Sequence, residues 1–188
     1  MFPSLMKLIQ TFRKTQDKNL LSPFKFKHNG KKDYSEIGDD NYMQRKDLIV
    51  SLLQDHSLQD KKLIKWLLKQ EIKYCAKIAD VAVPTTDLCA FLLYLYVEPQ
   101  DVFQIFKAKY ETNYDNSHSI DTELLLGKDI KETKRFLKKS GKKKSKKILK
   151  IIRQYEKDLK KNKTAFKSRE AYIEYYQEEK LKKLLSYL

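Results

Sequence analysis

The sequence predicts an all-α protein, built as a compact helical bundle or a short stack of helical hairpins with eight or nine helices. Only 4 Gly and 4 Pro occur in 188 residues, which leaves little material for tight turns between strands. Hydrophobic residues make up 41% of the chain, so a chain of this length can bury a core. Within several segments the apolar residues recur every three or four positions, which is the period of an amphipathic helix.

The first 40 residues predict a short helix followed by a polar linker. Ser4 can cap a helix that ends near residue 16. Residues 17–40 are polar and show no sustained apolar periodicity. We therefore expect a long loop or a partly disordered linker there.

A helical core is predicted over residues 41–137, and it begins with two amphipathic helices. The first runs from about residue 41 to residue 55. The second begins at a capping box formed by Ser57 and Asp60. Its apolar stripe continues to about residue 79, so one face of this helix should be buried.

The centre of the core is predicted at residues 85–97. Pro84 ends the preceding segment, and Thr85 or Thr86 is expected to cap the new helix. The run DLCAFLLYLYV is apolar on all sides. We therefore expect the other helices to surround this one.

The rest of the core is predicted from helix start and stop residues. Pro99 suits the first turn of a helix, and residues 111–119 are rich in turn formers. A short helix through residues 124–126 should stop at Gly127. Asp129 then begins a further helix, with Glu132 completing a second capping box.

Residues 138–188 predict a basic helical hairpin that is packed on the core or appended to it. Gly141 interrupts the lysine run, and Ser145 is expected to cap the helix that follows. Ser168 begins a last helix, which carries three tyrosines and several leucines. We expect those tyrosines mainly to pack at the edge of the core, although aromatic rings beside basic residues can also stack on bases.

The positive charge of the chain is concentrated in its last third. The net charge is +15 in total. Residues 1–127 contain 18 Lys and Arg against 17 Asp and Glu, whereas residues 128–188 contain 22 against 8. Such asymmetry indicates a basic surface that faces a partner, attached to a nearly neutral body.

The most concentrated cations surround Gly141, and they are the first candidate site. A solvated surface is the simplest interpretation, since the chain has 35 Lys and 5 Arg. Contact with nucleic acid or another polyanion would be independent of sequence and sensitive to salt. An acidic protein, a targeting receptor and an anionic membrane surface are further alternatives. The predicted polyanion-binding residues are Lys138, Lys139, Lys142, Lys143, Lys144, Lys146, Lys147 and Arg153.

A polar loop at residues 111–123 is the second, weaker candidate. Carboxylates close to an imidazole can bind a metal or transfer protons, but the same residue types form turns and helix caps. The chain contains no Gly-rich phosphate loop, His-Glu-x-x-His motif, Cys-x-x-Cys motif or nucleophile elbow. We therefore expect no cofactor and no metal. The candidate residues of this loop are Asp115, His118, Asp121 and Glu123.

Cysteine content and hydropathy predict a soluble cytoplasmic protein. Cys75 and Cys89 lie in apolar stretches, and we expect two buried free thiols, as in a reducing compartment. The N-terminal residues lack the pattern of a secretory signal, although their amphipathic character leaves an organellar presequence open. The longest apolar run, residues 88–97, is about half of what a membrane span requires.

These observations favour a non-catalytic binding or adaptor protein. In this interpretation the helical body contacts a protein partner, and the Lys-rich C-terminal third attaches to an acidic surface. The alternative is a sequence-independent nucleic-acid-binding protein that uses the same lysines. An enzyme with its site in the 111–123 loop is the third option. The sequence indicates neither the identity of the partner nor the oligomeric state.

Overall fold

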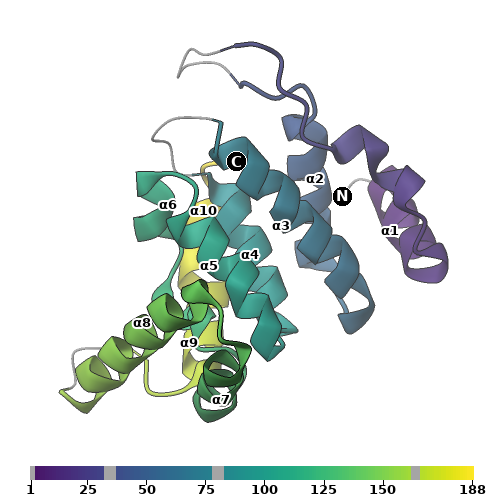
Figure 1. Cartoon of the computed structure of the whole chain (residues 1–188). Helices are drawn as coiled ribbons and strands as arrows, with labels where there is room; N and C mark the ends of the chain where they lie inside the picture. Colours follow the sequence, from purple (N-terminus) through teal and green to yellow (C-terminus); the bar gives the residue numbers. More distant parts are fainter. Residues whose placement is uncertain (1–2, 32–36, 78–82, 162–165) are drawn as a thin grey trace.

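The structure, a computed structural model, describes residues 3–31, 37–77, 83–161 and 166–188. These residues contain ten α-helices (Figure 1). No strand is present within these ranges, and the prediction of an all-α fold is confirmed. The helices are α1 (Pro3–Thr15), α2 (Tyr42–Gln54), α3 (Lys61–Cys75), α4 (Pro84–Leu95), α5 (Val102–Tyr110), α6 (Tyr114–Ser119), α7 (Ile130–Ser140), α8 (Lys143–Lys160), α9 (Arg169–Tyr175) and α10 (Leu181–Leu185).

Helix α4 is the central element, as its apolar sequence predicts. All its residues from Thr85 to Tyr94 are buried, and it contacts α2, α3, α5 and α10. The predicted cap was wrong, because Val83 is the N-cap residue and Pro84 is the first helical residue. The hydroxyls of Thr85 and Thr86 instead donate to the buried carboxylate of Glu71 on α3. A buried carboxylate needs donors, so it competes for these hydroxyls.

Two capping boxes fix the starts of α3 and α5. Ser57 and Asp60 form the predicted box on the 3₁₀ turn Leu58–Asp60 that leads into α3. Glu98 and Asp101 form another box, which the sequence analysis did not predict, on the 3₁₀ turn Pro99–Asp101 that leads into α5. Helix α3 ends at Cys75, so the end of the predicted stripe falls partly on residues 78–82, which lie outside the described ranges.

The N-terminal segment is packed more closely than its polar sequence suggests. Residues Lys18–Phe24 form a 3₁₀ helix, and Leu21 and Phe24 belong to the hydrophobic core. An isolated antiparallel bridge joins His28 to Asp39. Two apolar residues three positions apart are enough to anchor one short helix, but they are too few to produce a periodic signal.

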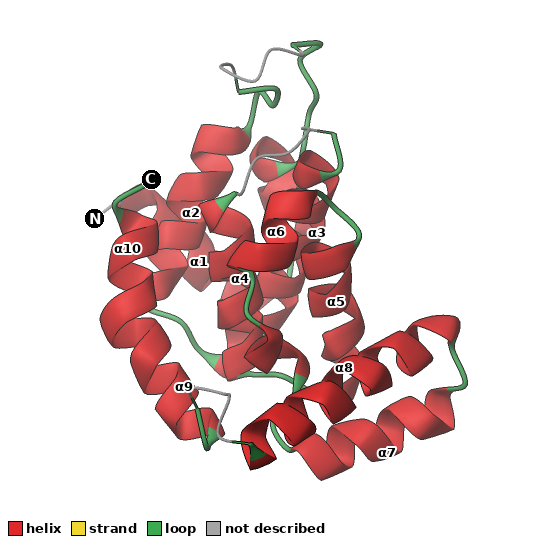
Figure 2. Ribbon diagram, turned by 90° about the vertical axis from the view of Figure 1, so that its left-hand side faces the viewer, coloured by secondary structure: helices red, strands yellow, loops and turns green. Residues whose placement is uncertain are grey.

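Helices α7 and α8 form an antiparallel hairpin that extends from one side of the molecule (Figure 2). Gly141 ends α7 in the left-handed conformation, with a φ of 64°, as its position in the lysine run suggests. The prediction that Ser145 caps α8 was wrong: α8 begins at Lys143, and Ser145 is buried against the hydroxyl of Ser140. Ser145 thus joins the two helices.

The chain ends in one continuous helical run made of α9, the π-helical turn Tyr176–Lys180 and α10. Ser168 caps it by accepting a hydrogen bond from the backbone N–H of Ala171, as predicted. Tyr176 is fully buried, and its ring stacks on that of Phe91 of α4 with centroids 3.6 Å apart. Within the described ranges, no helix has the length and apolar character needed to cross a membrane.

Candidate functional site

The α7–α8 hairpin carries most of the excess positive charge. We define the basic hairpin as residues 128–161, which contain sixteen Lys and Arg against four Asp and Glu, a net charge of +12. Its apolar face is buried: Ile148, Ile152 and Tyr155 belong to the hydrophobic core. Burial of that face turns the charged residues outward, and the two packed helices hold them in place.

A row of cations runs along one exposed face of α8. Its members follow one another at intervals of four, three, four and three residues, so they share one face of the helix. From first to last the row is about 20 Å long at 1.5 Å per residue. All five side chains are exposed. The residues are Lys146, Lys150, Arg153, Lys157 and Lys160.

The eight residues predicted from the sequence all lie on this hairpin, although two of them have partners. Lys144 forms an ion pair with Glu111 at 2.6 Å, and the ammonium group of Lys142 lies 4.8 Å from the ring centroid of Phe103. The other six are exposed and form no ion pair with any residue in the described ranges. These are Lys138, Lys139, Lys143, Lys146, Lys147 and Arg153.

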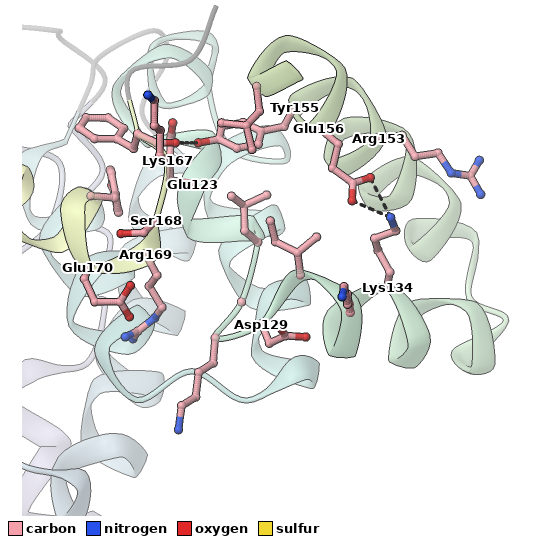
Figure 3. A pocket seen from close by; sticks show the side chains of 18 of the residues that line it. Glu123, Asp129, Lys134, Arg153, Tyr155, Glu156, Lys167, Ser168, Arg169 and Glu170 are labelled. Atoms are coloured by element: carbon pink, nitrogen blue, oxygen red, sulfur yellow. Dashed lines mark hydrogen bonds and ion pairs between the residues drawn. The ribbon is translucent and has the colours of Figure 1, made fainter. Parts of the chain in front are cut away.

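A groove of about 850 Å³ opens beside the hairpin, and sequence analysis did not predict it. We call it the hairpin groove; it lies between the start of α7, the second half of α8 and residues 166–170 (Figure 3). Six of its cationic side chains form no ion pair with described residues. They are Lys128, Lys131, Arg153, Lys157, Lys160 and Lys167.

Two further cations of the groove hold its walls together. Lys134 of α7 contacts both carboxylate oxygens of Glu156 of α8 at 2.7 Å, as Figure 3 shows. Arg169 donates to the carbonyl oxygens of Tyr94 and Leu95 at 2.9 and 3.2 Å, which satisfies the C-terminal end of α4. The first contact joins the two helices of the hairpin, and the second fixes α9 relative to α4.

Of the four carboxylates that line the groove, one is partly buried, two have a partner within the protein and one is exposed. Burial raises the pKa of Glu123 above its usual value, so its charge is disfavoured there. Asp129 accepts a hydrogen bond from the backbone N–H of Glu132 at 2.7 Å and so caps α7, and Glu156 is paired with Lys134. Glu170 remains exposed. The groove is therefore lined by more available cations than anions.

The structure brings together only two of the four candidate residues of the polar loop: His118 and Asp121 line a second pocket, but Asp115 and Glu123 do not. Asp115 lies in the first turn of α6, and His118 is exposed beside Tyr114. Asp121 accepts hydrogen bonds from Lys180 and Tyr172, whereas Glu123 lines the hairpin groove. In the described part of the chain, no group of three or more His, Cys, Asp and Glu side chains is placed to hold a metal ion.

A buried ionic cluster ties the last helix to α4. The ammonium group of Lys180 forms an ion pair with Asp87 at 2.8 Å, and it donates to Asp121 at 2.7 Å and to the carbonyl oxygen of Ser119 at 2.6 Å. The hydroxyl of Tyr176 donates to Asp87 at 2.9 Å. Burial raises the pKa of Asp87 to about 6, although Lys180 lowers it in part. Lys180 is thus surrounded by two carboxylates and a carbonyl oxygen, which indicates a structural role for the cluster.

A second buried network centres on Arg45 of α2. Its guanidinium contacts Asp39 at 2.7 Å and also binds Glu71, and all three side chains are inaccessible to solvent. The rings of Tyr42 and Tyr74 lie 5.8 and 5.7 Å from the guanidinium carbon. Sequence analysis missed both networks, because a single Arg or Asp within a helix gives no periodic signal.

Comparisons with models of protein families, with curated proteins and with solved structures find no match to this chain. A functional conclusion therefore depends on the geometry and charge of the residues described above. Of these, the basic hairpin combines exposure, a fixed arrangement and several cations that form no ion pair with the described residues.

Proposed function

We propose that the protein is a non-catalytic binding protein whose basic hairpin attaches to the phosphate backbone of nucleic acid without reading the sequence. The observation that carries this proposal is the row of exposed cations on α8, which have no ion-pair partner among the described residues. Phosphates along a strand repeat at short intervals, so a row of ammonium groups can contact several of them at once.

The charge balance supports a partner rather than solvation alone. A net charge of +12 within residues 128–161 causes self-repulsion that a stable fold does not need. A phosphate backbone would relieve that repulsion and release its condensed counterions, which favours binding. Lysine acts as a point charge, whereas base recognition favours the forked guanidinium of arginine. The prevalence of lysine therefore favours contact with the phosphate backbone of the nucleic acid over recognition of its bases.

The test is a salt titration of nucleic-acid binding with two matched variants. One variant replaces Lys143, Lys146, Lys147 and Lys150 of the hairpin by Gln. The control replaces four exposed lysines of α3 and its C-terminal end, Lys62, Lys69, Lys73 and Lys77. Both variants lose the same net charge, so only the position of the charge differs.

We expect log K of the wild-type protein to fall linearly with log salt concentration. The hairpin variant should bind more weakly, and its slope should be shallower by about 0.7 to 0.9 for each phosphate that it no longer neutralises. The α3 variant should keep nearly the wild-type slope. If both variants bind equally, the hairpin lysines are only a solvated surface and the proposal is wrong.

A second candidate function is attachment to a protein partner through the last helix. In and just after this helix, Tyr175 and Tyr187 are 39% and 67% exposed, and Leu185 is 41% exposed. Tyr175 and Tyr187 border the second pocket, which has a volume of about 820 Å³. Exposed tyrosines are enriched at protein interfaces. Replacing Tyr175 and Tyr187 by Ser should abolish binding to a protein partner, and that binding should persist at 300 mM salt.

A further inference from the structure

We infer that the hairpin groove selects single-stranded over double-stranded nucleic acid by stacking an unpaired base on Phe166. This inference rests on the proposed function, because it assigns the kind of strand that the basic hairpin holds. The row of cations on α8 can contact either kind of strand. The groove adds a contact that only a single strand can make.

Phe166 is the accessible aromatic side chain of the groove. Four aromatic residues line it, and three of them, Tyr94, Tyr155 and Tyr172, are buried. Phe166 alone among the four is half-buried, so it is the aromatic residue of the groove that a ligand can reach. Base stacking on such a ring tolerates any sequence, because every base has a π-face.

Neighbouring groups hold the Phe166 ring in place. The ring of Tyr172 meets it edge-on with centroids 5.3 Å apart, and the ring of Tyr175 lies 4.8 Å away. The hydroxyl of Tyr155 on α8 also donates to the carbonyl oxygen of Phe166 at 3.3 Å. A ring supported in this way is ordered before a base arrives, which lowers the entropic cost of binding.

Cations flank the ring on both walls of the groove. Lys157 and Lys160 are exposed on α8, and Lys167 follows Phe166 in the chain on the opposite wall. None of the three forms an ion pair with a described residue. An aromatic platform between backbone-binding cations is the arrangement by which proteins hold single strands.

A duplex cannot use this groove. Its bases are paired and stacked on one another, so no π-face is free for Phe166. The volume of about 850 Å³ is also that of a pocket for a small ligand. A duplex would therefore contact the exposed cations of α8 alone, whereas a single strand would also stack a base on Phe166.

The test measures how tightly three proteins bind a labelled oligonucleotide at one salt concentration. The oligonucleotide is used both as a single strand and as the matched duplex. The proteins are the wild type, Phe166→Leu and a control, Phe136→Leu. Phe136 is also half-buried and lies on α7, but it does not line the groove. Thermal unfolding of each protein verifies that it is folded.

Phe166→Leu should weaken single-strand binding by roughly 5- to 100-fold and change duplex binding by less than about twofold. Phe136→Leu should change neither. If Phe166→Leu lowers both affinities equally, or lowers neither, the inference is wrong. In that case the proposed function still stands, provided that the hairpin lysine variant loses binding to both strands. If the wild type binds neither strand, both proposals fail.

A second comparison serves if Phe166→Leu does not fold. One variant replaces Lys128, Lys131 and Lys167, which line the groove but do not belong to the row on α8, by Gln, and the other replaces Lys143, Lys146 and Lys147 near the hairpin turn. The groove variant should lower the ratio of single-strand to duplex affinity, because it removes contacts specific to the groove. The turn variant should weaken both affinities and leave their ratio unchanged. Equal ratios in the two variants would overturn the inference.

Discussion

The helical body and the basic hairpin use charged residues in opposite ways. In the body, Arg45 and Lys180 are enclosed with carboxylates that neutralise them. In the hairpin, Lys146 and Lys150 are exposed and have no ion-pair partner among the described residues. Buried charges need partners because desolvation is costly, whereas exposed charges contribute little to stability. The body's charges are therefore part of its packed interior, whereas the hairpin's charges remain available to a ligand.

The largest effect on stability is expected where a buried cation is removed. Arg45→Met would leave Asp39 and Glu71 buried without a counter-charge, and it should lower the free energy of unfolding by about 3–5 kcal/mol. Chemical denaturation measures this change. Lys150→Met on the hairpin is the matched control, with an expected change below about 0.5 kcal/mol. Equal losses in the two variants would remove the contrast between body and hairpin.

The titration of the Asp87 carboxyl group should contribute to the pH dependence of the free energy of unfolding. Its folded-state pKa of about 6 lies above its usual value of 3.8, so the folded protein binds this proton more tightly. The stability that protonation supplies is complete below about pH 4 and is lost as the pH rises through about 6.

Asp87→Asn removes this titration, while Lys180 stays protonated throughout this range. Relative to the wild type, the variant should therefore become more stable by up to about 3 kcal/mol as the pH rises from 4 to 7. Urea denaturation at several pH values measures the difference. Parallel stability curves for the two proteins would contradict the prediction.

A smaller effect is expected at the glycine that joins the body to the hairpin. Gly127 has a φ of 72°, and a Cβ there would lie 2.1 Å from the hydroxyl oxygen of Thr133. Gly141 in the hairpin has a φ of 64° and no atom within 4 Å of such a Cβ. Gly141→Ala should cost about 1 kcal/mol from backbone strain alone. Gly127→Ala should cost roughly 1–3 kcal/mol more, and equal thermal shifts would argue against the clash.

The smallest effect on stability is expected for the hairpin lysines themselves. Replacing Lys143, Lys146, Lys147 and Lys150 together by Gln should change the free energy of unfolding by less than about 0.5 kcal/mol. A small gain is the expected direction, since the substitution reduces self-repulsion. A large loss of stability would show that these lysines support the fold, which would contradict the difference between the body and the hairpin.

Much of the fold could be predicted because it depends on local signals. The apolar run of α4, the capping box at Ser57 and the cap at Ser168 each involve residues that are close in sequence. The caps predicted at Thr85 and Ser145 were wrong for one reason. Each hydroxyl has a partner on another helix, Glu71 and Ser140 respectively, and such contacts depend on tertiary packing.

The candidate site was predictable in its charge but not in its shape. The lysine run around Gly141 was visible in the sequence, and a run of charge indicates an exposed surface. The groove was not visible, because its walls come from residues as distant as Lys131 and Lys167. Phe166 carries no sequence signal of its own, since one aromatic residue after a polar stretch is common. Only the packing of α7, α8 and α9 brings it beside the cations.

The π-helical turn near the C-terminus affects how many residues this segment can contain. Four buried or half-buried residues, Tyr172, Tyr176, Lys180 and Leu184, are spaced four apart on the face toward α4 and α6. In a regular α-helix that spacing would rotate by about 40° at each step. The wider turn takes up one extra residue and keeps the four side chains in line. Deleting one exposed residue between Tyr176 and Lys180 would give the spacing four, three, four, which an ordinary α-helix also aligns. We therefore expect the segment to tolerate either length.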